Sequence, residues 1–405
     1  MAKAARPKLV SAPIIIAVCF AIAALEGYDI QAVGVAAPSM APALHLADQQ
    51  IGQAGSWAMV GLVLGALIGG WAADRIGRKI VLVGAVAWFG VFSIVTAGVH
   101  SAEMLMISRL LTGLGFGGAM PNMIAIASEI SPPGKRGATV TTMFVGMPAG
   151  GALAALIARY LPHGFDWRMI YIIGGALPLV LTPVALWLLP ETRPVRDPKA
   201  DRRVLFALFG GGRAPSTLLM WIAYAFTLVV LYLMLGWLPM LVIAKGLGKD
   251  VASWAALSFN GIGVLGGLTL GVLVDRFKFG WPMFLTYVGL IASMAILATA
   301  TGALQVLILS GLVGFGVIGA QYSLYALAPL YYAPPVRGAG SGAAVGAGRI
   351  GSIVGPLLAG TLREQHASAA QVLTYTLPVI LVAGLAAMLL VSFGKPYAAE
   401  GDHVA

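Results

Sequence analysis

Long apolar stretches alternate with short polar breaks along the whole chain, and many of these breaks contain glycine or proline. A helix needs roughly 20 apolar residues to cross a bilayer, and each stretch is about long enough to do so. The predicted helices cover residues 12–38, 51–73, 80–98, 103–127, 137–158, 168–190, 216–244, 252–274, 281–299, 303–329, 338–360 and 370–393. The pattern therefore predicts an all-α membrane protein with twelve transmembrane helices.

The composition agrees with a bilayer environment. Of the 405 residues, 59% are hydrophobic and only 10% are charged, and the mean hydropathy is +0.91. An average soluble domain is about one quarter charged, so these values argue against a soluble enzyme. Cys19 is the only cysteine, which excludes an intramolecular disulfide and a cysteine-rich metal site.

The formal net charge of +10 raises the question of whether the chain binds nucleic acid. The basic residues gather on one side of the predicted membrane instead, since 18 of the 25 lie on the side of the N-terminus. Lys and Arg are enriched in cytoplasmic loops, so we expect both termini in the cytoplasm and the chain in a bacterial inner membrane. The basic charge reports this topology, and no nucleic-acid partner is expected.

The sequence repeats itself at an offset of 201 residues. The matched pairs include Pro38 with Pro239, Asp74 with Asp275, Arg75 with Arg276, Gly113 with Gly314, and Arg136 with Arg337. Charged residues and prolines match as well as glycines, so a glycine-rich composition alone does not explain the repeat. We predict an N-terminal six-helix half over residues 1–190, a cytoplasmic linker over 191–215 and a C-terminal six-helix half over 216–405.

The break after the second predicted helix carries the strongest motif. It reads Gly70-Trp-Ala-Ala-Asp74-Arg75-Ile-Gly77-Arg78-Lys79. This segment resembles the signature loop of the major facilitator superfamily. The resemblance implies two pseudo-symmetric six-helix halves, with the substrate held between them near the middle of the membrane, and a loop that forms part of a cytoplasmic gate.

Contacts of this loop can be anticipated. We expect Gly70 to permit a close approach of helices, and Asp74 to cap a helix end or accept ion pairs. The basic residues are expected to bridge to neighbouring helix ends such as Glu129. The second copy of the loop keeps Asp275 and Arg276. The alternative interpretation is an ordinary cytoplasmic loop rich in basic residues.

Three charged residues lie in predicted helices of the first half away from the helix ends, namely Glu26, Asp29 and Arg109. A charge at the bilayer centre costs on the order of 3 kcal/mol, so each needs a partner inside the protein. Glu26 and Asp29 are three residues apart and share one helix face. Their segment resembles the first-helix signature of the aromatic acid/proton symporters, with Glu26 in place of the usual aspartate.

The segment that begins at Arg109 resembles a second superfamily motif, in which the buried arginine takes part in proton coupling. The two resemblances together imply proton-coupling roles for Glu26, Asp29 and Arg109. Two alternatives remain open: Arg109 reaches the periplasmic surface, or one of the acids only holds Arg109 or a break in the helix.

Candidate substrate contacts come from both halves. Arg349 lies near the middle of its predicted helix and is placed to bind an anion with two parallel hydrogen bonds. Gln321, Tyr322 and Tyr325 match the aromatic acid/proton symporters, and the two tyrosines are placed to flank an aromatic ring while Gln321 binds a hydroxyl. Gln31 and Tyr232 complete the candidate set. The alternative for Arg349 is an internal ion pair, and for the tyrosines it is helix packing.

The resemblance to the aromatic acid/proton symporters, which include hydroxyphenylpropionate and hydroxybenzoate transporters, covers essentially the whole chain. It implies a proton-coupled importer of a small aromatic carboxylate that works by alternating access. The alternatives are a symporter of aliphatic acids or a drug/proton antiporter of the same fold. We expect no enzyme activity, no cofactor other than the coupling proton and no metal. We also expect the chain to be a monomer in the lipid bilayer.

Overall fold

The computed structural model describes residues 11–131, 136–160, 166–192, 208–210, 212–277, 279–332 and 336–394. The helices of the first half are α1 (Ala12–Ala43), α2 (Asp48–Ile76), α3 (Arg78–Ala97), α4 (Ala102–Ile130), α5 (Arg136–Phe144), α6 (Gly146–Tyr160) and α7 (Arg168–Leu188). The helices of the second half are α9 (Ala214–Ala244), α10 (Lys249–Phe277), α11 (Gly280–Thr299), α12 (Ala303–Leu327), the short 3-10 helix η2 (Ala328–Tyr331), α13 (Arg337–Glu364) and α14 (Ala369–Phe393).

Twelve segments of the described chain are long and apolar enough to cross a membrane, as predicted. The chain is thus a multi-pass membrane protein. Two details differ from the sequence prediction. The fifth predicted helix is split into α5 and α6 around Val145, and α1 continues beyond Pro38 to Ala43. Helices inside a membrane tolerate proline because neighbouring groups can satisfy the freed backbone carbonyls.

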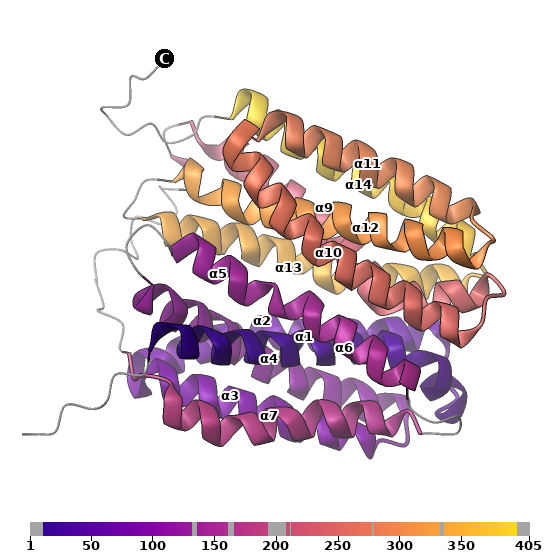
Figure 1. The fold of residues 1–405 in the computed structure, drawn as a ribbon, viewed down its shortest axis with the longest axis horizontal. Helices are drawn as coiled ribbons and strands as arrows, with labels where there is room; N and C mark the ends of the chain where they lie inside the picture. Colours follow the sequence, from indigo (N-terminus) through magenta and orange to yellow (C-terminus); the bar gives the residue numbers. More distant parts are fainter. Residues whose placement is uncertain are drawn as a thin grey trace, which may run out of the picture.

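The two halves lie side by side, with α1 to α7 in the lower part of Figure 1 and α9 to α14 in the upper part. The start of α1 and the end of α14 lie at the same end of the bundle, here called the terminal end. The halves meet along two seams, where α2 packs on α13 and where α6 packs on α10. The predicted linker falls mostly on residues outside the described part of the chain.

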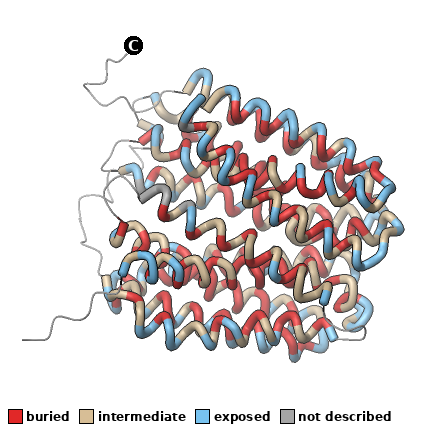
Figure 2. The backbone as a smooth tube through the Cα atoms, in the orientation of Figure 1, coloured by how far each residue is buried: buried red, intermediate tan, exposed pale blue. Residues whose placement is uncertain are grey.

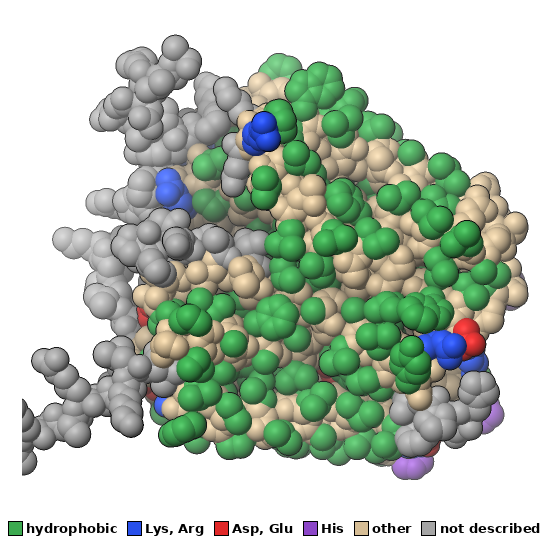
Figure 3. All heavy atoms as spheres, viewed as in Figure 1, with side chains coloured by type: hydrophobic (Ala, Val, Ile, Leu, Met, Phe, Trp, Pro, Cys, Tyr) green, Lys and Arg blue, Asp and Glu red, His purple; other side chains and the backbone are tan. Residues whose placement is uncertain are grey.

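Burial follows the bundle geometry. Buried residues face the inside of each half, while exposed residues lie along the outer faces of the helices (Figure 2). Those outer faces carry hydrophobic side chains over most of the surface in view, and the described charged side chains there lie towards the two ends of the bundle (Figure 3). This distribution fits a lipid environment. Cys19 is buried inside the bundle, with no exposed side-chain surface.

Glycines bring α2 and α4 into backbone contact. A Cβ atom at Gly65 would overlap the carbonyl oxygen of Leu114, and one at Gly117 would overlap the carbonyl oxygen of Leu62. A Cβ atom at Gly70 would meet no atom within 4 Å. The prediction that Gly70 permits close helix approach is therefore wrong. This role belongs to other glycines such as Gly65, because Gly70 lies on a face of α2 that no neighbouring helix covers.

The seams are closed at the end of the bundle opposite the termini, here called the distal end. Arg363 on α13 pairs with Asp48 on α2 at 3.5 Å, and Arg159 on α6 pairs with Asp250 on α10 at 3.2 Å. Gly52 lies against Pro356 so closely that a Cβ atom would overlap the Pro356 carbonyl oxygen. Each half contributes an acid at the start of its second helix and an arginine at the end of its fifth membrane span.

Candidate functional site

A small cavity lies between the halves and is lined by side chains of both. Of the six predicted substrate contacts, Gln31, Tyr232, Gln321, Tyr322 and Tyr325 line it, together with Asn260. The cavity volume is about 50 Å³. For comparison, a cavity of about 150 Å³ accommodates benzene. The cavity is therefore contracted in this conformation, and an aromatic acid requires it to widen.

Arg349 lies beside the cavity rather than in its wall. The side chain is 6% exposed, and it donates hydrogen bonds to the hydroxyl of Tyr232 at 3.0 Å and to the sulfur of Met120 at 3.0 Å. No salt bridge to Arg349 occurs among the described residues, so the alternative of an internal ion pair is not supported. Tyr232 both lines the cavity and accepts from Arg349, which connects the positive charge to the cavity.

An aromatic cluster from both halves lines the cavity. The rings of Tyr322 and Tyr325 stack with centroids 6.2 Å apart, and Phe144 of the first half stacks on Tyr325 at 5.9 Å. Tyr322 also donates to the carbonyl oxygen of Phe144 at 2.8 Å. Both tyrosines line the cavity, and the prediction that they flank a substrate ring stays a prediction. Gln321 donates to the Tyr325 hydroxyl at 2.8 Å.

Asn260 was missed by the sequence analysis. It exchanges two hydrogen bonds with Gln31 across the halves, at 3.0 Å and 2.7 Å. The sequence signal was present, because a polar amide within an apolar membrane-spanning stretch is itself an indication of a functional site. An uncharged amide costs less to bury in the membrane than a charged group, so its signal in the sequence is weaker.

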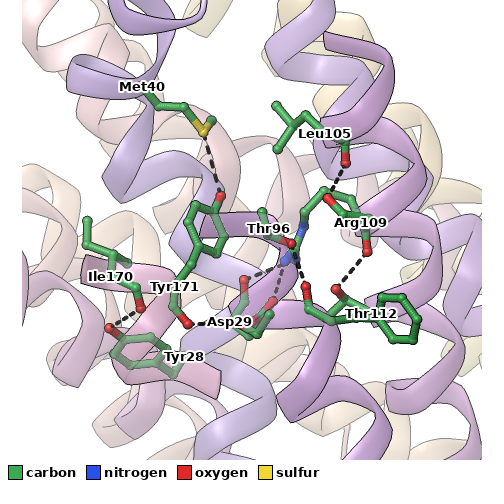
Figure 4. Close-up of polar contacts among 12 residues, drawn as sticks. Tyr28, Asp29, Met40, Thr96, Leu105, Arg109, Thr112, Ile170 and Tyr171 are labelled. Atoms are coloured by element: carbon green, nitrogen blue, oxygen red, sulfur yellow. Dashed lines mark hydrogen bonds and ion pairs between the residues drawn. The ribbon is translucent and has the colours of Figure 1, made fainter. Parts of the chain in front are cut away.

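Asp29 and Arg109 form a fully buried ion pair within the first half (Figure 4). The Arg109 guanidinium donates to the Asp29 carboxylate at 2.5 Å and to the Asp29 carbonyl oxygen at 3.2 Å. Ser93 of α3 donates a hydrogen bond to the same carboxylate, and the Tyr171 ring of α7 lies 5.7 Å from the guanidinium. The alternative in which Arg109 reaches the surface is wrong, because its side chain is 0% exposed and bound to Asp29.

Glu26 has a different environment from Asp29 although both are on α1. Its side chain is fully buried, and neither carboxyl oxygen has a hydrogen-bond partner among the described residues. It lies within electrostatic range of Arg349 and of Tyr325 in the second half. An ionised carboxylate without a partner is very unfavourable in a buried position. The site therefore contains one carboxyl that is paired with a cation and one that has no hydrogen-bond partner among the described residues.

The motif loop at the terminal end makes some of the predicted contacts. Arg78 forms a salt bridge with Glu129 of α4, as predicted. Gly77 has a φ of 99°, and a side chain there would collide with the carboxylate of Glu191. Glu191 also accepts from the backbone N–H of Lys79 at 3.4 Å, so the segment after α7 closes over the loop.

The other described residues of the predicted gate form no salt bridges within the described part of the chain. Asp74 is exposed and takes part in no salt bridge within the described chain, so the expected ion pairing is absent. Arg75 lies over the ring of Trp71 at 3.8 Å. Arg276 is exposed and lies 5.4 Å from the ring of Phe277. Asp275 belongs to α10, and its side chain lies outside the described part. Within the described residues, no group of three His, Cys, Asp or Glu side chains could hold a metal ion.

The arrangement of two six-helix halves around a polar, aromatic cavity defines a membrane transporter. The sequence matches the Major Facilitator Superfamily over residues 19–356, and the chain belongs to this superfamily and, within it, to the family that contains the aromatic acid transporters. Members of the superfamily are transporters, so the prediction that the chain is not an enzyme is confirmed.

The relatives are similar over almost their whole length. The 3-(3-hydroxy-phenyl)propionate transporter of Escherichia coli is 40% identical over 93% of this chain and 93% of its own length. The 4-hydroxybenzoate transporter PcaK of Pseudomonas aeruginosa is 34% identical over 92% of this chain and 90% of its own. A gallate transporter of Pseudomonas putida is 33% identical over 86% of this chain and 85% of its own.

Solved structures confirm the fold. A bacterial homolog of the human lysosomal transporter Spinster, in an inward-facing and unoccupied conformation, has a TM-score of 0.78 over 94% of this chain and 97% of its own, at 16% identity. A D-xylose-proton symporter has a TM-score of 0.74 over 95% of this chain and 99% of its own, at 18% identity.

Proposed function

We propose that the chain is a proton-coupled symporter that imports a small aromatic carboxylate by alternating access. The observation that carries the proposal is the composition of the central cavity. Aromatic rings and amides from both halves surround it, and Tyr232 connects it to the buried Arg349. A guanidinium suits a carboxylate, and tyrosine rings suit an aromatic ring. The names of the relatives, which are transporters of hydroxylated aromatic acids, support the same substrate class.

We propose Glu26 as the proton carrier and Asp29 as a structural partner of Arg109. Asp29 accepts from Arg109 and from Ser93, so its charge is already compensated. Glu26 has no such partner and lies within range of Arg349. When the substrate carboxylate binds Arg349, it competes with Glu26 for the same positive charge, and Glu26 then needs a proton. Substrate and proton therefore bind together.

Proton coupling also has an energetic reason. Import of one negative charge against an inside-negative potential costs about 2.3 kcal/mol per 100 mV. Cotransport of one proton removes that cost. With both termini in the cytoplasm, as the distribution of basic residues favours, the closed distal end faces the periplasm. We further propose that the protein works as a monomer in the inner membrane.

Uptake into proteoliposomes tests this function. Labelled 3-(3-hydroxyphenyl)propionate and 4-hydroxybenzoate are supplied with and without an inward proton gradient. The native protein is expected to accumulate at least one acid only under the gradient. Glu26→Gln is expected to lose this accumulation but to keep exchange of labelled for unlabelled acid, because a neutral Gln mimics the protonated carboxyl. Arg349→Ala is expected to lose both activities.

Glu103→Gln is the matched control, because Glu103 is an exposed acid in the first turn of α4. It should behave as the native protein does. If the native protein accumulates neither acid under a gradient, the proposed substrate class is wrong, and aliphatic acids and drugs become the next substrates to test. If Glu26→Gln still accumulates substrate, Glu26 is not the proton carrier.

A further inference from the structure

A pair of buried amides joins the two halves at the cavity. Gln31 Nε2 donates to Asn260 Oδ1 at 3.0 Å, and Asn260 Nδ2 donates to Gln31 Oε1 at 2.7 Å. The side chains are 4% and 1% exposed. Gln31 belongs to α1 and Asn260 to α10, so the reciprocal bonds connect one half to the other.

Both amides are held in place by their own half. Asn260 Nδ2 also donates to the carbonyl oxygen of Ala256, one turn earlier on α10, at 2.9 Å. The Gln31 amide lies directly on Gly151 of α6, where any side chain would overlap it. The two groups therefore present fixed hydrogen-bonding atoms to the cavity when they are not bonded to each other.

The amide pair and Arg349 belong to different seams. Arg349 is on α13, which packs on α2 and α9, whereas Asn260 is on α10, which packs on α6 and α12. The cavity lies between them, since Tyr232, the partner of Arg349, and Asn260 both line it. An aromatic acid with its carboxylate at Arg349 therefore extends its ring towards the amide pair.

Gln31 and Asn260 can satisfy each other's hydrogen-bonding groups only while the cavity is contracted. A cavity of about 50 Å³ must widen to admit an aromatic ring, and movement of the halves then separates the amides. A buried amide that loses its partner is costly unless another group replaces it. A phenolic hydroxyl both donates and accepts, so it can bind an amide oxygen and an amide N–H together. A ring without a hydroxyl leaves those atoms unpaired.

We propose that Asn260, together with Gln31, binds the ring hydroxyl of the substrate and makes the transporter select hydroxylated over unsubstituted aromatic acids. This inference rests on the proposed function. Sites that hydrogen-bond a substrate hydroxyl reject analogues that lack it far more strongly than apolar pockets do. Opening the amide pair thereby becomes favourable for the hydroxylated acid alone.

The test compares 3-(3-hydroxyphenyl)propionate with 3-phenylpropionate, which lacks the hydroxyl. The ratio of kcat/KM for the two acids is measured in the native protein, in Asn260→Leu and in Ser258→Ala. Ser258 is on the same helix but donates to Leu307 of α12 and does not line the cavity, so it is the control. In Asn260→Leu the ratio is expected to fall about tenfold, as for the loss of one hydrogen bond. The fall in the ratio should come from a lower kcat/KM for the hydroxylated acid, while kcat/KM for 3-phenylpropionate is retained.

An unchanged ratio, or an equal loss for both acids, would overturn the proposal, because a purely structural amide pair affects both substrates alike. If Asn260→Leu does not assemble, Asn260→Ala and Asn260→Val, which also lack a hydrogen-bonding side chain, are assayed for the same ratio under the same criteria. A native protein that transports both acids equally well also contradicts it. If the native protein transports 4-hydroxybenzoate but neither propionate, the ratio is measured for 4-hydroxybenzoate against benzoate under the same criteria. A native protein that transports none of these acids refutes the proposed function first, and the hydroxyl site with it.

Discussion

The two acids of α1 show how three residues of sequence separation become two different chemical environments. Asp29 turns towards α3 and α4 and joins a closed network of hydrogen bonds, whereas Glu26 has no partner and lies near the interface between the halves. The buried pair of Asp29 and Arg109 stays inside one half. It can therefore keep its geometry while the halves move relative to each other.

Asp29→Asn is expected to destabilise the protein. Breaking a buried ion pair from one side costs about 3–5 kcal/mol, because the remaining charge has no partner. The unfolding temperature in detergent should fall clearly. Replacing both residues by apolar ones, as in Asp29→Leu with Arg109→Met, should recover part of the loss. If Asp29→Asn is as stable as the native protein, Arg109 must find another partner in that variant.

The sequence predicted the charged site residues because charges inside apolar stretches are costly and thus informative. It could not show which acid pairs with Arg109, since both share one face of α1 and only the packing of α4 decides between them. It also missed Asn260, whose partner Gln31 is far away in sequence. Such pairings depend on how the two halves meet, which no local pattern encodes.

At the scale of elements, the membrane helices are held by backbone contact as much as by side-chain packing. Apolar side chains gain little by leaving lipid for a helix interface, so close approach through small residues matters more than in water. Gly65 and Gly117 provide this approach between α2 and α4. The motif residue Gly70 lies only five positions from Gly65 but meets no neighbour.

Gly65→Ala and Gly70→Ala therefore form a matched pair. Overpacking by an added methyl group costs about 1–3 kcal/mol, so Gly65→Ala should lower the unfolding temperature and the yield of folded protein. Gly70→Ala should leave both unchanged. Equal sensitivity at the two positions would mean that Gly70 makes its contact in another conformation, and this would restore the role that the motif predicted.

At the scale of the whole molecule, an ion pair at the distal end joins the two halves at each seam, and the two pairs are arranged in the same way. Asp48 with Arg363 closes one seam and Asp250 with Arg159 closes the other. The internal repeat explains this arrangement, because equivalent helices of the two halves exchange roles across the interface. Partly exposed ion pairs contribute only about 0.2–1 kcal/mol each. Such small energies suit contacts that must form and break in every transport cycle.

Reversing both acids, as in Asp48→Lys with Asp250→Lys, is expected to favour the conformation that is open at the distal end. Two pairs of this strength shift the conformational ratio by about 2- to 30-fold. Faster hydrogen exchange at the distal ends of α2 and α13 would report the shift. Asp166→Lys is the control, because Asp166 pairs with Arg168 within one half. No difference from this control would exclude the ion pairs as a determinant of the conformational ratio.

The burial of Cys19 has a practical consequence for measuring these motions. A thiol reacts with a maleimide only when the reagent can reach it, and Cys19 has no exposed surface. Cys19 is therefore not expected to react with thiol-specific probes, and it can be left in place when other cysteines are introduced for labelling. Spin labels or fluorophores attached to two introduced cysteines, one at the distal end of each half, would report the distance between the halves as substrate and protons are added.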